Sequence, residues 1–380
     1  MAEESSALGG AATAAEASSE ERIFVATQWQ LMWWRFRHHR LAMASAVVTI
    51  LFYLAAAGAD FLAYSDPHES EALRSLMPPQ PIHFFDEGGF HPHVYALVGK
   101  RDPATMKRVY APDPTQKIPI RFFARGFKYK FLGFVRTDRH LIGVEGARAE
   151  ETIFILGTDM QGRDVWSRLM YGTQISLSIG VVGVALSLFL GILLGGISGL
   201  YGGVIDTIIQ RLIEMLRSIP SIPLWMGLAA ALPRGWPILR IYFAITIILS
   251  LIGWTTLARQ VRGRFLALRE EDFIMAAELA GCSRMRIIFR HMVPSFMSHI
   301  IAATTLAIPI MIISETSLSF LGLGLRPPAI SWGVMLQQAQ NVQTVAITPW
   351  LMIPAIPVII AVLALNFLGD GLRDAADPYG

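Results

Sequence analysis

The stretch EDFIMAAELAGCSRMRIIFRHMVPS (Glu271–Ser295) lies between two long apolar runs and is rich in charged residues. Its pattern predicts two short helices separated by Gly281, because glycine readily adopts the left-handed conformation in which many helices end. Pro294 marks the start of the next apolar run. A polar hairpin held between apolar segments predicts an all-α membrane protein with a loop suited to docking another protein.

The first predicted helix, Asp272–Ala280, carries an apolar and small face, with residues at helical spacing at Phe273, Ala276, Ala277 and Ala280. Small side chains allow a helix to enter a groove on a partner closely. Acidic residues at its start favour the helix dipole. The second predicted helix is basic and can face lipid phosphate or an acidic partner. The alternative interpretation is an ordinary hairpin that lies on the membrane surface.

The composition also predicts a membrane protein. The chain has 380 residues, of which 53% are hydrophobic and 16% charged, and its mean hydropathy is +0.46. A soluble domain carries more charge, and about 20 apolar residues cross the hydrocarbon of a bilayer. The sequence predicts about six such spans, at 41–63, 175–198, 204–231, 236–258, 296–319 and 349–368. The net charge of +3 does not suggest a nucleic-acid surface, and the single cysteine, Cys282, excludes an intrachain disulfide framework.

Arginines indicate the orientation, because positive charge near the end of a span favours the cytoplasm. Arg35, Arg37 and Arg40 precede the first span, and the loop after the fourth span is also basic. Both termini are therefore expected inside, and the first 20 residues are expected to be disordered. The predicted organisation is a cytoplasmic tail (1–40), a first transmembrane helix (41–63), an extracytoplasmic insertion with an interfacial helix (64–174), a five-helix core (175–368) with a docking loop (260–294), and a cytoplasmic tail (369–380).

The insertion is the only sizeable region expected outside the membrane. Alternating runs at Lys117–Phe123 and Tyr129–Arg136 predict a few strands. His91 and His93 are candidates for a metal pair, with His83, Asp86 or Glu87 as further ligands. We expect no metal there, because the spacing matches no familiar site and no cysteine is nearby.

The stretch LGTDMQGRDVWSRLMYGTQISLSIG (Leu156–Gly180) leads into the second span. Thr158 or Asp159 is expected to cap a helix that carries Arg163, Asp164 and Arg168. This helix can be an amphipathic interfacial helix, or it can shape the outer mouth of a pore, and the two interpretations are compatible.

Within the spans, glycines recur every four residues, at Gly191, Gly195, Gly199 and Gly203. This stripe predicts close helix–helix packing, either within the chain or with a partner. Prolines are expected to bend or interrupt the third span (Pro220, Pro223) and the sixth (Pro354, Pro357).

Charged residues inside spans are costly, so each requires an explanation. Arg211 and Glu214 can pair across one helical turn. Glu315 lies in a mostly apolar helix, where it can bind substrate, relay a proton, or be a hydrogen-bonded interior residue that holds helices together. We favour the last interpretation.

The polar hairpin resembles the EAA loop of ABC importer permeases. Four positions match that pattern at the right spacing: Ala276, Ala277, Gly281 and Pro294. Val293 replaces a leucine, Met275 stands where the family has its glutamate, and His291 stands where it usually has isoleucine. The resemblance implies that the loop docks an ATPase subunit through Asp272, Phe273, Ala276, Ala277, Glu278, Gly281, Arg290, His291 and Pro294.

Three further stretches are similar to permeases of the peptide/nickel class: 156–180 (with Gln174 where arginine is usual), 315–333 and 365–378. The long insertion resembles that of microcin C-type peptide importers. The resemblance implies a type I permease of the bacterial inner membrane that pairs with a homologous permease, two ATPases and an extracytoplasmic binding protein, among membrane lipid.

By that resemblance, this chain binds no cofactor, and ATP and Mg are used by the partner subunits. Peptides are the first expected substrate; nickel chelates, opines, oligosaccharides and peptide antibiotics remain open. The alternative class is an ion-coupled transporter or channel that uses Glu315 and the pair Arg211–Glu214. A membrane hydrolase is disfavoured, because neither HExxH nor GxSxG is present.

Overall fold

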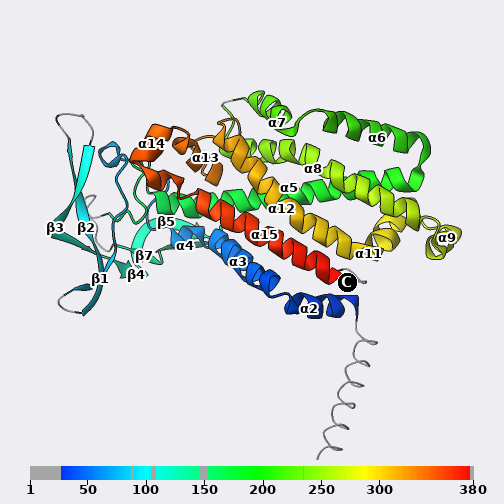
Figure 1. Ribbon diagram of the computed structural model, residues 1–380, viewed down its shortest axis with the longest axis horizontal. Coiled ribbons are helices and arrows are strands. Elements are labelled where there is room, and N and C mark those ends of the chain that lie inside the picture. Colours follow the sequence, from blue (N-terminus) through cyan, green and yellow to red (C-terminus); the bar gives the residue numbers. More distant parts are fainter. Residues whose placement is uncertain are drawn as a thin grey trace, which may run out of the picture.

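The computed structural model describes residues 27–86, 89–101, 103, 108–144, 152–233 and 235–376. Helices form an elongated bundle, and the described strands gather at one end of it (Figure 1). This arrangement confirms the prediction of a helical, multi-pass membrane protein with a small mixed insertion. The disorder expected for the first 20 residues, the possible ligand Glu87 and the last four residues lie outside the described residues.

Five described helical segments are long and apolar enough to cross a membrane, judged by length and composition. They are α3 (Arg40–Ala57), α5 (Val165–Tyr201), α8 (Ile238–Leu268), α12 (Met297–Phe320) and the segment Pro349–Ala376, which comprises η5 (Pro349–Met352) and α15 (Ala355–Ala376).

The predicted span at 204–231 is interrupted, as its prolines predicted, and it is not among the five long apolar segments. It is broken into the amphipathic α6 (Gly203–Ser218) and the short α7 (Ser221–Ala230). Pro220 is the cause, because a proline disfavours helical backbone at the residue before it. Ile219 is accordingly extended, with φ −93° and ψ 131°. Together, α6 and α7 lie along one side of the helix bundle (Figure 1).

The remaining helical elements are short: α2 (Gln28–His38), α4 (Ala59–Leu62), η1 (Ala72–Arg74), α9 (Asp272–Leu279), α10 (Arg284–Arg286), the π-helical turn η3 (Ile287–Met292), α11 (Val293–Ser295), α13 (Trp332–Leu336), η4 (Gln337–Ala339) and α14 (Val342–Ile347). Figure 1 shows α2, α9 and the C-terminal end of α15 at one end of the bundle, opposite the strands. The hairpin and both ends of the described chain therefore share one side.

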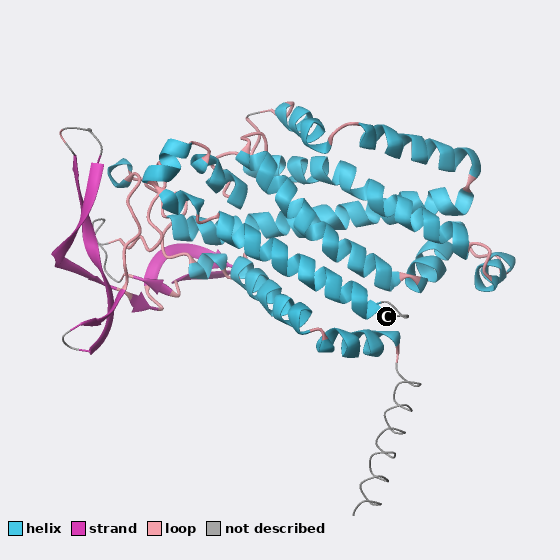
Figure 2. Cartoon of the chain, in the orientation of Figure 1, coloured by secondary structure: helices cyan, strands magenta, loops and turns pink. Residues whose placement is uncertain are grey.

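The strands form three small antiparallel units, drawn in magenta in Figure 2. They are the sheet β1 (His83–Asp86), β2 (Gly89–Arg101) and β3 (Arg108–Pro119), the pair β4 (Arg121–Phe122) and β7 (Ile142–Gly143), and the pair β5 (Arg125–Phe131) and β6 (Val135–Arg139). Buried Val94, Ile118, Ile120 and Ile153 pack with Tyr64 into a core of their own. The insertion is thus built around apolar residues that do not belong to the bundle.

Candidate functional site

The predicted docking helix is α9, at the end of the bundle opposite the strands (Figure 1). Its inward side chains are Ile274 and Ala277, which pack with Phe265 of α8 and Leu200 of α5. Burial of these apolar groups fixes α9 on the bundle. Its outward surface is apolar and includes Phe273, Met275, Ala276 and Leu279, of which Leu279 is 90% exposed.

Ala277 is a correction to the expected docking face. It is only 7% exposed and lies against the chain's own interior, whereas Phe273, Ala276 and Ala280 are exposed. The sequence spacing alone could not show which side of α9 faces the bundle, because α9 carries apolar residues on both its inward and its outward side. The acidic residues Asp272 and Glu278 are exposed as well.

Gly281 ends α9 in the left-handed conformation, with φ +77°. Its N–H donates to the carbonyl of Glu278 at 2.9 Å, and the N–H of Cys282 donates to the carbonyl of Ala277 at 3.1 Å. These two bonds form a Schellman motif, which satisfies the last carbonyls of a helix. The turn therefore sets the direction in which the chain leaves α9.

The second part of the hairpin is less regular than a single helix and comprises α10, η3 and α11. The guanidinium of Arg284 lies 4.5 Å from the centroid of the Tyr201 ring, which ties the hairpin to the end of α5 by a cation–π contact. Arg290 is exposed, His291 is half-buried, and Pro294 is exposed within α11, just before α12.

An ion pair that the sequence did not reveal fixes the same end of the bundle. Arg262 of α8 donates two hydrogen bonds to the carboxylate of Asp206 on α6, each 2.6 Å long. Ser198 of α5 also donates to Asp206. The three helices α5, α6 and α8 are joined here, directly behind α9. Asp206 and Arg262 are far apart in the sequence, so their pairing could be recognised only once α6 and α8 were known to lie side by side.

Three of the four striped glycines lie in the interface between α5 and α8. A Cβ added at Gly195 would lie 2.5 Å from the carbonyl oxygen of Ala258. One at Gly199 would lie 2.6 Å from the Cβ of Phe265, and one at Gly191 would lie 2.9 Å from the Leu257 side chain. Gly203 lies apart from this stripe, because it begins α6 with φ +57°, and a Cβ there would meet nothing of this chain within 4 Å.

Glu315 is fully buried in α12 and is bonded to three serine hydroxyls. Ser319 donates to Oε1 at 2.7 Å, Ser331 donates to Oε1 at 2.8 Å, and Ser176 of α5 donates to Oε2 at 3.2 Å. The backbone N–H of Trp332 in turn donates to the Ser176 hydroxyl. The carboxyl group therefore joins α12, α5 and α13, as expected of an interior residue that holds helices together.

We expect Glu315→Gln to fold normally. The amide oxygen can accept from Ser319 and Ser331, and the amide nitrogen can donate to the Ser176 oxygen, so the links between α12, α13 and α5 are kept. The check is the thermal midpoint of the purified variant in detergent, which should stay close to that of the wild type. A midpoint far below that of the wild type would show that the carboxylate itself is needed to hold these helices together.

A cavity of about 440 Å³ lies between α5, α7, α8 and α12. Its lining is mostly apolar, with polar groups from Ser187, Thr256 and Gln260. Among the residues that the structure describes, neither the indole nitrogen of Trp225 nor the hydroxyl of Thr304 finds a hydrogen-bond partner, and both residues line this cavity. A mostly apolar cavity with a few polar groups is typical of a small-molecule path.

At the opposite end of the bundle, the stretch 156–180 forms a buried network. Asp164, rather than the expected Thr158 or Asp159, caps α5 by accepting from the N–H of Ser167 at 2.7 Å. Asp159 instead pairs with Arg163 at 2.7 Å. No separate interfacial helix exists here, because α5 runs unbroken from Val165 to Tyr201.

The two carboxyl groups of this network differ in pKa. Burial would raise the pKa of Asp159, but hydrogen bonds from Arg163 and the charge of Arg168 outweigh it, so the pKa lies below its ordinary value. Burial raises the pKa of Asp164 to about 6, although Ser167 and the Tyr64 hydroxyl bond to it. Gln338 and Trp350 also bond to this network, so it closes the strand-side end of the helices.

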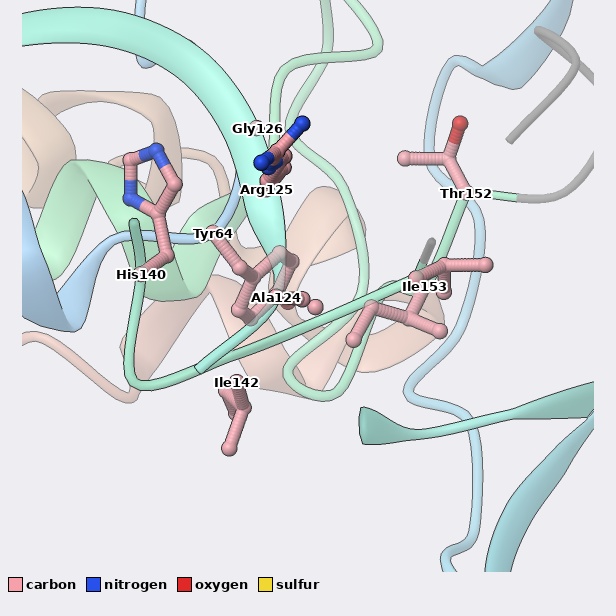
Figure 3. Close-up of a pocket in the computed structure, with 10 residues that line it drawn as sticks. Tyr64, Ala124, Arg125, Gly126, His140, Ile142, Thr152 and Ile153 are labelled. Atoms are coloured by element: carbon pink, nitrogen blue, oxygen red, sulfur yellow. The ribbon is translucent and has the colours of Figure 1, made fainter. Parts of the chain in front are cut away.

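A smaller cavity, of about 230 Å³, lies within the strand-containing segment. Figure 3 shows Tyr64 and Ala124 between His140 on one side and Ile153 and Thr152 on the other. Within the described part of the chain, no three His, Cys, Asp or Glu side chains gather as a metal site would require. The rings of His83 and His93 stack at 5.5 Å.

Comparison with known proteins places these features in a family. Residues 191–379 match the family model described as "Binding-protein-dependent transport system inner membrane component", and residues 27–79 match "N-terminal TM domain of oligopeptide transport permease C". Most of the strand-containing segment lies between the two matched regions.

Individual relatives support the same family assignment as the family models. The oligopeptide transport system permease protein OppC of Bacillus subtilis is 38% identical over 223 residues, which cover 58% of this chain and 70% of that protein. The dipeptide transport system permease protein DppC of Bacillus subtilis is 38% identical over 58% of this chain and 68% of that protein. OppC of Haemophilus influenzae is 35% identical over 65% of this chain and 78% of that protein.

Among solved structures, an inward-facing MetNI methionine ABC transporter chain matches with a TM-score of 0.42 at 18% identity, over 55% of this chain and 96% of that chain. The family assignment rests on the sequence relatives and the family models. This chain belongs to the inner-membrane components of binding-protein-dependent transport systems, and it is a multi-pass transport permease.

Proposed function

We propose that this chain is a permease subunit of an ATP-driven importer of peptides or related small solutes, and that α9 docks it to an ATPase subunit. The observation that carries the proposal is the exposed apolar surface of α9 (Phe273, Met275, Ala276, Leu279) on a helix whose other side is locked into the bundle. Such a surface is suited to a protein partner.

The peptide assignment is supported by the names of the relatives, which are oligopeptide and dipeptide permeases. In the proposed assembly, this chain pairs with a homologous permease, two ATPases supply ATP hydrolysis with Mg, and a binding protein delivers the solute. The proposed orientation puts α9 and both termini in the cytoplasm, in agreement with the arginine pattern. The strands then lie outside.

The proposed mechanism is alternating access. Closure of the ATPase pair moves α9, and the rigid contacts of Ile274 and Ala277 with α8 and α5 pass that motion to the helices. The cavity between α5, α7, α8 and α12 is our candidate for part of the solute path. The indole of Trp225 and the hydroxyl of Thr304 could bond to a peptide group there.

The ion-coupled alternative has less support. Arg211 and Glu214 pair at 2.8 Å on the outside of α6, with side chains 77% and 58% exposed. Glu315 is bonded to three hydroxyl groups, which accounts for its burial without a transported ion. Neither observation favours a separate ion path.

Affinity capture tests the docking proposal. The tagged wild-type chain, extracted in mild detergent from cells that express the whole transporter, should bring down ATPase subunits, a second permease and the binding protein. Phe273→Asp should reduce ATPase recovery at least about tenfold, because a buried aromatic anchor commonly dominates an interface. The second permease should still be recovered.

Leu73→Asp is the matched control, since Leu73 is 64% exposed at the strand end of the chain. It should leave ATPase recovery unchanged. Equal ATPase recovery with Phe273→Asp and with the wild type would show that α9 is not the docking surface.

A further inference from the structure

The hairpin β5–β6 has an apolar tip that is exposed to an unusual degree. Phe134, Leu132 and Val135 are 75%, 51% and 50% exposed. Residues 125–139 of this hairpin also contain five basic residues and one acidic residue: Arg125, Lys128, Lys130, Arg136 and Arg139 against Asp138. All five basic side chains are exposed. Exposed apolar groups ringed by cations are typical of segments that enter the head-group region of an anionic bilayer.

The turn at the tip places an exposed leucine in the left-handed region. Leu132 and Gly133 both have positive φ, +50° and +85°, and the N–H of Phe134 donates to the carbonyl of Phe131 at 3.2 Å. These residues lie in the three-residue loop between the paired Phe131 and Val135, and the left-handed conformation there is usually taken by Gly, Asn or Asp. A leucine in the left-handed region is strained, because its Cβ crowds the following carbonyl oxygen.

The base of the hairpin is fixed at the level where the first spanning helix ends. Helix α3 has 18 residues and is therefore about 27 Å long, close to the roughly 30 Å of bilayer hydrocarbon. Helix α4 begins two residues later with Ala59. The Asp60 carbonyl is bonded by His140 at 3.1 Å, directly after β6, and the Asp60 carboxylate by Tyr171 of α5 at 2.5 Å.

One side of the hairpin is already covered by the protein. The rings of Phe127 and Tyr129 pack on His140, with centroids 4.4 and 5.0 Å away. Because successive residues of a strand point to opposite faces, Lys128 and Lys130 point away from this contact. The hairpin thus lies against α4, beside the helices (Figure 1), with its cations turned outward.

We propose that the β5–β6 hairpin is a bilayer-binding element. Leu132, Phe134 and Val135 enter the boundary between head groups and acyl chains on the strand side of the membrane. Lys128, Lys130 and Arg136 contact anionic lipid phosphate. Strand β1 offers a contrast: its residue Phe85 is 74% exposed, but β1 lies at the outer end of the strand-containing region, away from the spanning helices (Figure 1).

Site-specific quenching tests the proposal. The chain has one cysteine, so a Cys282→Ser background allows single labels at Phe134→Cys and, as the matched control, at Phe85→Cys. Each chain is labelled with an environment-sensitive fluorophore and reconstituted, with its partner subunits, into phosphatidylcholine/phosphatidylglycerol vesicles. A fraction of the lipid carries a nitroxide high on its acyl chain. We expect quenching at position 134 to be several-fold stronger than at position 85.

The cations are tested in the same vesicles. Quenching of the label at position 134 should weaken in the triple variant Lys128→Gln/Lys130→Gln/Arg136→Gln. In the chain that keeps these three cations, quenching should weaken when phosphatidylglycerol is replaced by phosphatidylcholine. Lys100→Gln/Arg101→Gln, on the distant β2, should change nothing. Equal weak quenching at positions 134 and 85 would overturn the proposal. So would a label at position 134 that responds only when the soluble binding protein is added, because the tip would then be a protein-docking site.

Discussion

Gly281→Val is expected to leave the transporter assembled in the membrane while solute uptake falls by about tenfold or more, equivalent to about 1.4 kcal/mol of coupling. Gly281 has φ +77°, a conformation that costs an L-residue about 1–2 kcal/mol and a β-branched residue more. To escape that strain, the turn must change, and the bonds to Glu278 and Ala277 that end α9 are lost. In the proposed assembly, helix α9 then no longer meets the ATPase at its normal angle.

The measurement compares ATP hydrolysis with uptake in the same proteoliposomes. Hydrolysis should continue while uptake drops, so the ratio of solute moved to ATP consumed should fall. No heavy atom outside its neighbouring residues lies within 4 Å of a Cβ built on Gly281, so a clash within this chain cannot cause the effect. Gly281→Asn is the matched control, because asparagine tolerates the left-handed region and should keep most coupling. A wild-type ratio of solute moved to ATP consumed in the valine variant would show that this turn has no role in coupling.

The first helix of the hairpin could be predicted from the sequence because its signals are local. An acidic first turn and a glycine at the end predicted a helix over Asp272–Ala280, close to the observed Asp272–Leu279. What the sequence could not give was the side of α9 that faces inward. Ile274 and Ala277 are buried because Phe265 and Leu200, from two distant helices, come to lie beneath them.

The third span shows a different limit. Pro220 and Pro223 predicted a bend or interruption, but hydropathy counted the whole segment as one span. The structure separates α6 from α7 where Ile219 is extended before Pro220. The strong amphipathic pattern of α6 was a further signal, since a lipid-exposed span is apolar on all sides. The carboxylate of Asp206 on α6 is paired by Arg262 of α8, so α6 relies on the neighbouring helix to neutralise this charge.

The insertion could be predicted only in outline. The run Tyr129–Arg136 was expected to be a strand, yet it contains the turn between β5 and β6. Leu132 gives no turn signal, because leucine rarely has positive φ. The same residue lies at the exposed apolar tip of the hairpin that we propose as a bilayer-binding element.

Gly195→Leu is expected to prevent or severely weaken the packing of α5 against α8. The new Cβ would lie 2.5 Å from the carbonyl oxygen and 2.8 Å from the Cα of Ala258. Both are backbone atoms, so no side-chain rotation relieves the contact and the helices must separate. Overpacking of a well-packed site typically costs 1–3 kcal/mol; with backbone in the way we expect at least about 3 kcal/mol, or a fall in the thermal midpoint on the order of 10 °C.

The measurement is the midpoint of heat-induced loss of the monodisperse peak in detergent, followed by size-exclusion chromatography. Gly263→Leu is the matched control, since Gly263 lies on α8 itself and a Cβ there would meet nothing within 4 Å. Both changes add the same side chain to a helix of the same pair and raise helix propensity equally. A large difference between them can therefore come only from the contact with Ala258. Equal midpoints would mean that α5 and α8 are not held at this distance, and the stripe of Gly191, Gly195 and Gly199 would then have to pack against a partner chain instead.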